Sequence, residues 1–121
     1  MLKLQKNEGT DSSVRLALSG CLDLAGVMQV EADFVEATSA PGKHAIVDFS
    51  QVTFISSLGI AMLIRRNNSL RSSGMRLILL RPNRDIESVF VKAGLTRMLA
   101  IAHDESAVTQ ILATAPPAES A

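Results

Sequence analysis

The chain has 121 residues, with twelve basic and twelve acidic side chains and a formal net charge of zero. This length favours a single domain, and the neutral charge gives no general attraction to nucleic acid or to an anionic membrane. The chain has no tryptophan, no tyrosine and only four phenylalanines. Its core must therefore be built mainly from aliphatic side chains, which favours helices packed on a sheet.

The cysteine content and the apolar stretches limit the class of protein further. Cys21 is the only cysteine, which excludes an internal disulfide and a cysteine-based zinc site. The N-terminal residues lack the apolar run of a signal peptide, and no apolar stretch approaches the ~20 residues that a bilayer crossing needs. We therefore expect a soluble, cytoplasmic protein that does not insert into a membrane.

Two strands are predicted at the N-terminus. Leu2 and Leu4 alternate with polar residues, and the residues from Val14 to Ser19 alternate in the same way. This pattern is typical of strands with one buried face, and the polar stretch between them predicts a hairpin. Gly20 is expected to end the second strand.

A helix, a strand and a second helix are predicted next. Asp23 is expected to cap the first helix, which ends before Gly42 and buries one apolar face: Val27, Val30, Phe34 and Ala37. The nearly continuous apolar run from Ala45 to Phe49 favours a central strand covered on both faces. Helical spacing then predicts a helix from Ser57 to about Ser72, ended at Gly74.

The C-terminal part continues the alternation. Leu77–Leu80 is predicted to be a buried strand, and Pro82 is expected to open a helix that ends before Gly94. A short strand is predicted from Met98 to Ala102, followed by a helix capped by Asp104.

The predicted order is β-β-α-β-α-β-α-β-α in one α/β domain over residues 1–113. It implies a mostly parallel central sheet with an antiparallel N-terminal edge strand and about four helices. Residues 114–121 contain too few apolar side chains to pack and are expected to be a disordered tail. Ligands and partners of such sheets usually meet the carboxyl ends of the strands.

Two serines lie at one of these ends, in the run VDFSQVTFISSLGI. Ser56 is expected to be the N-cap of the helix, accepting a hydrogen bond from the backbone N–H of Leu58 or Gly59. Gly59 would let another group approach the first turn closely. Ser57 would then be an uncommitted hydroxyl at the positive end of the helix dipole. The simplest alternative is that both serines only cap and solvate the helix start.

Apolar residues on a second side of this helix also need an explanation. Leu58, Ala61 and Met62 follow helical spacing but are offset from the inward face that begins at Ile60. Either a neighbouring helix covers them or they form a docking patch.

The charges are unevenly distributed along the chain. Residues 61–100 contain eight basic and only two acidic side chains. This imbalance is compatible with ordinary solvated faces, or with a basic side that meets an acidic partner protein.

The runs VDFSQVTFISSLGI, RSSGMRLILLRP and VFVKAGLTRMLAIAHDESAV together resemble STAS domains, in particular bacterial anti-sigma factor antagonists. The similarity extends in element order from about Leu2 to Leu112. In that family, a serine kinase that is also the anti-sigma factor phosphorylates a serine or threonine at this helix start. The unphosphorylated antagonist binds the kinase and frees the sigma factor, and a phosphatase resets the switch. The resemblance implies no cofactor in the chain itself and leaves a homodimer possible.

Carried onto this chain, the resemblance makes Ser57 the phosphoacceptor, with Asp48, Ser56 and Gly59 as its neighbours. The expected partner-binding residues are Leu58, Ala61, Met62 and Arg84. Two positions depart from the family pattern. Ser56 stands where many members have aspartate, which removes a charge that could orient a kinase. Leu58 stands where many members have a second serine, a threonine or a small residue.

The serious alternative is a constitutive STAS interaction module without a phosphorylation switch. Relatives of this kind serve as scaffold subunits of stress-sensing assemblies or as accessory subunits of lipid-transport ATPases. Stable binding to a partner without any phosphorylation would distinguish this alternative.

Catalytic interpretations have less support. Asp48 resembles the phosphoacceptor of response-regulator receivers, but the required acidic cluster and late lysine are missing, so Asp48 is expected to bond within its own turn with Ser50. His44 and His103 give no sign of pairing with a nucleophile, and no metal or nucleotide motif is present. We therefore expect neither catalysis nor a metal site.

Overall fold

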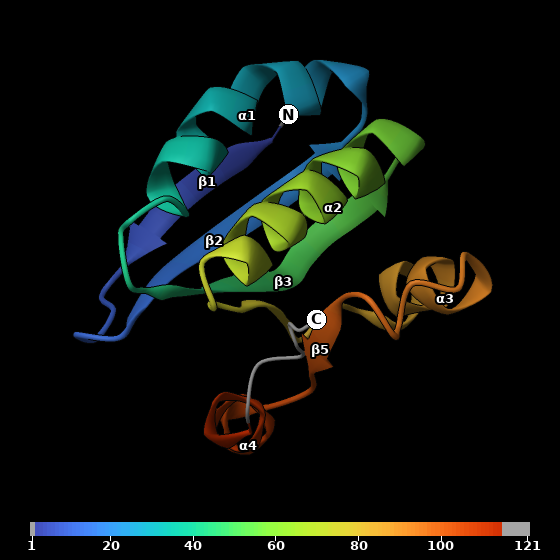
Figure 1. Cartoon of the computed structure of the whole chain (residues 1–121). Coiled ribbons are helices and arrows are strands. Elements are labelled where there is room, and N and C mark those ends of the chain that lie inside the picture. Colours follow the sequence, from blue (N-terminus) through green and yellow to red (C-terminus); the bar gives the residue numbers. More distant parts are fainter. Residues whose placement is uncertain (1, 115–121) are drawn as a thin grey trace.

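A computed structural model describes residues 2–114 and confirms the predicted alternation of strands and helices (Figure 1). The elements are β1 (Lys3–Asn7), β2 (Ser13–Leu22), α1 (Leu24–Ala37), β3 (His44–Ile55), α2 (Ser57–Ser72), β4 (Leu77–Leu80), α3 (Arg84–Lys92), β5 (Ala100–Ala102) and α4 (Glu105–Ala113). Of the predicted C-terminal tail, residues 115–121 lie outside the described residues.

The five strands form one sheet in the order β1-β2-β3-β4-β5. β1 is antiparallel to β2, and the other neighbouring strands are parallel, so the predicted α/β fold with an antiparallel edge strand is confirmed. Because each parallel strand lies next to its predecessor, right-handed crossovers place successive helices on the same face of the sheet. Helices α1 and α2 accordingly lie side by side over β1, β2 and β3 (Figure 1).

The two faces of the sheet are packed differently. The larger core lies under α1 and α2, where Leu16, Val47 and Phe34 are fully buried or nearly so. A smaller apolar cluster on the other face lies under α4: Ile46, Ile78, Leu80, Ala102 and Val108. Neighbouring residues of β3 point to opposite faces, so Ile46 and Val47 belong to different clusters.

The central strands are longer than their apolar runs. β2 continues through Gly20 to Leu22, so the prediction that Gly20 ends the strand is wrong. Gly20 has a φ of 110° beside a shift in strand register, which indicates a bulge. β3 continues past Phe49 to Ile55, whereas β4 stops opposite Asp48. Beyond that point β2 and β3 continue together as a two-stranded ribbon.

The helix starts follow the predicted caps with one exception. The side chains of Asp23 and Asp104 accept hydrogen bonds from the backbone N–H groups of Gly26 and Ala107, both at 2.8 Å. Helix α3 begins at Arg84 and not at Pro82, because Asn83 is its cap.

Candidate functional site

The junction between β3 and α2 is fixed by Ser56. Its hydroxyl donates to the carbonyl oxygen of Leu22 at 2.8 Å and accepts from the backbone N–H of Gly59 at 3.3 Å. Its backbone N–H also donates to the Leu22 carbonyl, at 2.9 Å. The predicted N-cap is therefore confirmed, and the same hydroxyl ties the start of α2 to the end of β2.

Ser57 has the opposite character. Its side chain is exposed at the first position of α2, and within residues 2–114 no side-chain hydrogen bond of Ser57 is found. The unpaired N–H groups of the first turn give this helix end a partial positive charge. Helix α2 contains no acidic residue. The Ser57 oxygen thus lies at a helix end that favours a negative group.

Gly59 serves a different purpose from the one predicted. It is buried, and an added Cβ would lie 2.8 Å from Cγ1 of Ile55 and 3.1 Å from both Cβ and the carbonyl oxygen of Leu22. The group that approaches closely is therefore the ribbon of β2 and β3 itself. Gly59 lets α2 pack on that ribbon and leaves no space there for a partner.

The predicted docking residues divide between surface and core. Leu58 is 45% exposed and Ala61 is half-buried, so both remain available at the surface. Met62 is completely buried, and its prediction as a docking residue is wrong. Met62 is offset from Ile60 as the sequence indicates, but its side of α2 is the side that packs against α1.

The structure brings apolar side chains of α1 to the same end of the sheet. Leu24 is 58% exposed and Met28 is 76% exposed. Glu31 Oε2 and Arg65 Nη2 form an ion pair at 2.5 Å between α1 and α2. Leu24 lies seven residues before Glu31, and Leu58 lies seven residues before Arg65. Because residues seven apart share one side of a helix, Leu24 and Leu58 lie on the facing sides of the two helices.

We call Leu24, Met28, Leu58 and Ala61 the α1–α2 patch. The sequence prediction missed its α1 half. The signal was the i, i+4 pair of Leu24 and Met28, which lies off the correctly predicted buried face of α1. Phe54, 51% exposed at the end of β3, was missed as well.

Asp48 does not lie beside Ser57, and that prediction is wrong. It is inside β3, opposite Leu80, and seven residues of extended strand put it about 20 Å from Ile55. Its carboxylate accepts a hydrogen bond from the backbone N–H of Ser50 at 2.8 Å, as predicted for the structural alternative. Asp48 also lines a hollow with Arg81 and Glu105 on the α4 side.

Helix α3 begins close to the carboxyl end of β3. The Asn83 side chain donates to the carbonyl oxygen of Val52 at 2.9 Å, three residues before Ile55. The next residue, Arg84, is exposed. Arg84 therefore borders the same end of β3 that leads to Ser57.

The groups that suggest catalysis or ligand binding lie elsewhere. His44 begins β3, whereas His103 pairs with Glu87 at 2.9 Å and Cys21 lies near Thr53. In residues 2–114 no three histidine, cysteine or carboxylate groups are arranged to hold a metal ion. A hollow of about 530 Å³ lies between the hairpin turn and the end of α1, and neither Ser56 nor Ser57 lines it.

No helix in the described part of the chain combines the length and apolar character needed to cross a bilayer.

Residues 6–101 match the family model described as "Mlab, STAS domain". The anti-sigma factor antagonist SpoIIAA in its unphosphorylated form is similar in structure, with a TM-score of 0.73 and 26% sequence identity over 93% of this chain and 98% of that chain. The phosphorylated form of the Bacillus cell fate determinant SpoIIAA gives a TM-score of 0.66 and 27% identity over 90% of this chain and 99% of that chain. A protein from Thermotoga maritima gives a TM-score of 0.77 at 20% identity, over 88% of this chain and 92% of that chain, which shows the fold alone. No curated protein matches the chain.

Proposed function

The chain belongs to the STAS domain family, and from that premise we propose that it is a cytoplasmic anti-sigma factor antagonist switched by phosphorylation of Ser57. In this proposal the kinase is also the anti-sigma factor, and a phosphatase restores the binding form. In this proposal the chain is not an enzyme, and the kinase binds the nucleotide. Support comes from the likeness to SpoIIAA, whose structure is known in unphosphorylated and phosphorylated forms.

The observation that carries the proposal is the difference between the two adjacent hydroxyls. Ser56 is committed to hydrogen bonds with Leu22 and Gly59. Ser57 is exposed and has no side-chain hydrogen bond to the described residues. A kinase could therefore reach Ser57 without disturbing the cap, and the helix N-terminus would tolerate the added negative charge.

The effect on binding follows from the surroundings of Ser57. A phosphate adds about 1.5 to 2 negative charges. A partner that covers Leu58 and Ala61 would also have to desolvate this group. A penalty of ~3 kcal/mol is enough to weaken binding about a hundredfold. Arg84, at the border of the same site, is proposed to contact acidic groups of the partner.

Phosphate mapping tests this function. The chain would be incubated with ATP and its cognate serine kinase of the anti-sigma type, and the modified residue located by mass spectrometry. We expect phosphate on Ser57 in the wild type, no incorporation in Ser57→Ala, and continued incorporation in the matched variant Ser56→Ala. Phosphate on another residue, or incorporation that survives in Ser57→Ala, would contradict the assignment.

One observation favours a second candidate, a constitutive interaction module such as a stress-sensing scaffold or an accessory subunit of a lipid-transport ATPase. Residue 56 is a serine whose hydroxyl donates to Leu22, which an aspartate could not do. The junction therefore has no carboxylate at this position to orient a kinase. Tight partner binding by the wild type with no phosphate after incubation with kinase and ATP would support this candidate.

A further inference from the structure

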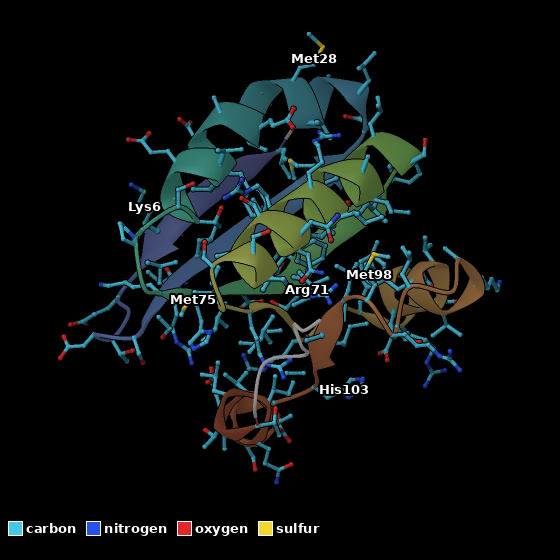
Figure 2. All side chains as sticks on the ribbon, in the orientation of Figure 1. Lys6, Met28, Arg71, Met75, Met98 and His103 are labelled. Atoms are coloured by element: carbon cyan, nitrogen blue, oxygen red, sulfur yellow. The ribbon has the colours of Figure 1, made fainter. Side chains whose placement is uncertain are left out.

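The outer face of α1 is unusually apolar for a surface helix. Its inner face is buried at Val27, Val30 and Phe34. The rest of the helix surface nevertheless carries further apolar residues: Leu24, Ala25, Met28, Ala32 and the half-buried Val35. Met28 projects away from the sheet (Figure 2). Adjacent exposed apolar side chains on a surface helix are typical of a contact surface.

Helices α1 and α2 carry opposite charges. The charged residues of α1 are all acidic: Glu31, Asp33 and Glu36. Those of α2 are all basic: Arg65, Arg66 and Arg71. Each helix therefore presents a surface that is electrostatically complementary to its neighbour.

The two helices are also parallel and aligned. The two bonds from Ser56 to the Leu22 carbonyl bring the start of α2 level with the start of α1. The Glu31–Arg65 ion pair then joins them at similar distances from their starts. The surface therefore has an apolar end, formed by the α1–α2 patch, and a charged end.

We propose that a second copy of this chain packs on the outer surface of α1 and α2. The two-fold axis runs parallel to the helices, above the groove between them. This axis places α1 of each copy on α2 of the other copy, with all four helices pointing in the same direction. Leu24 and Met28 then meet Leu58 and Ala61 of the second copy, and the acidic helix lies against the basic one.

The arrangement specifies a pair of charges that can be tested. The Glu31–Arg65 pair marks the sides on which α1 and α2 face each other. Glu36 points away from α2, and Arg71 points away from α1. Each is about 20 Å from the start of its helix. The proposed axis brings Glu36 of one copy next to Arg71 of the other. This contact occurs twice, once on each side of the axis.

The size of the surface sets the expected strength. Two helices about 20 Å long, together about 20 Å wide, cover roughly 400 Å² per copy, about half of a standard stable interface. Self-association should therefore be weak and dependent on concentration. The second copy covers Leu58 and Ala61, which the kinase is also proposed to contact, so the test uses the unphosphorylated chain without kinase. Self-association can therefore fail while the proposed function holds.

Sedimentation velocity from about 10 µM to about 1 mM, a range suited to a weak interface, tests the proposal. The wild type is expected to shift from monomer to dimer, and Met28→Glu is expected to raise the dissociation constant at least about tenfold. The matched control is Val91→Glu on α3, since Val91 is 56% exposed and lies outside this surface. A wild type that stays monomeric, or a Val91→Glu variant as impaired as Met28→Glu, would overturn the proposal.

Charge reversal gives an independent test at low ionic strength. Glu36→Lys and Arg71→Glu are each expected to weaken the dimer by about threefold to tenfold, because each places like charges opposite one another. The double variant restores the opposite charges and should recover most of the affinity. No recovery in the double variant would contradict the two-fold arrangement.

Discussion

The polar groups at the two ends of β3 differ in how they are hydrogen-bonded. At the amino end, the His44 backbone N–H donates to Ser12, and its ring Nδ1 accepts from the backbone N–H of Arg76 at 3.0 Å. At the carboxyl end, Ser56 is bonded in the same manner, but Ser57 and Leu58 remain at the surface. At the amino end, the polar groups of His44 are hydrogen-bonded within the protein. The groups left over at the carboxyl end are those available to another molecule.

The largest effect is expected when a buried residue and an exposed residue of the same turn of α2 are compared. Met62→Ala should lower the free energy of unfolding by about 2–5 kcal/mol, since it leaves a cavity in the core. The control, Leu58→Ala, should cost much less because Leu58 is partly exposed. Denaturant unfolding measures both. Similar losses in the two variants would mean that α2 is not oriented as described.

Gly59→Ala should have the next largest effect. The added Cβ would crowd Ile55 and the backbone of Leu22, and overpacking of this kind costs about 1–3 kcal/mol of stability. Gly74→Ala is not a suitable control, because Gly74 has a φ of 77° and strain would add to the result. Ala61→Gly tests the ordinary helix propensity at the same helix end. Alanine is favoured over glycine in a helix by about 1 kcal/mol. A gain in stability of Gly59→Ala as large as the loss in Ala61→Gly would therefore show that α2 does not pack closely on the ribbon.

Ser56→Ala and Ser57→Ala test the two hydroxyls directly. Loss of the N-cap should lower the free energy of unfolding by about 1 kcal/mol. A further loss is expected because the Leu22 carbonyl keeps only its bond from the backbone N–H of residue 56. Ser57→Ala should leave stability almost unchanged. Thermal or denaturant unfolding measures the stability of both variants. A larger loss in Ser57→Ala than in Ser56→Ala would contradict the different roles of the two hydroxyls.

The smallest expected effect belongs to the amino end of β3. Burial, followed by the charge of Arg76, lowers the pKa of His44 from 6.5, so the folded state favours the neutral ring. This contribution to stability is complete above about pH 6.5 and decreases as the pH falls, because the unfolded chain binds the proton more readily. His44→Gln should flatten the change in unfolding midpoint between about pH 8 and about pH 5. An unchanged profile would show that His44 is not the responsible group.

Most of the fold could be predicted because the sequence marks it locally. Alternating residues identify β1 and β2, caps such as Asp23 mark the helix starts, and right-handed crossovers determine the sheet. The length of β3 was not predictable in this way. Past Phe49, β4 no longer covers the strand, and exposed residues such as Thr53 interrupt the apolar run.

The candidate site was predicted only in part for a related reason. The Ser56 cap depends on neighbouring residues, so sequence reasoning found it. The burial of Met62 and the exposure of Met28 depend on how α1 and α2 pack against each other. The separation of Asp48 from Ser57 depends on the true end of β3. These are properties of tertiary packing, which residue spacing alone does not determine.

The central claim is tested most directly by measuring how tightly the kinase binds the chain before and after stoichiometric phosphorylation of Ser57. Isothermal titration calorimetry should show about a hundredfold weaker binding of the phosphorylated chain, equivalent to ~3 kcal/mol. Circular dichroism should show that its fold is unchanged. Equal affinity of the two forms for the kinase would contradict the proposed switch.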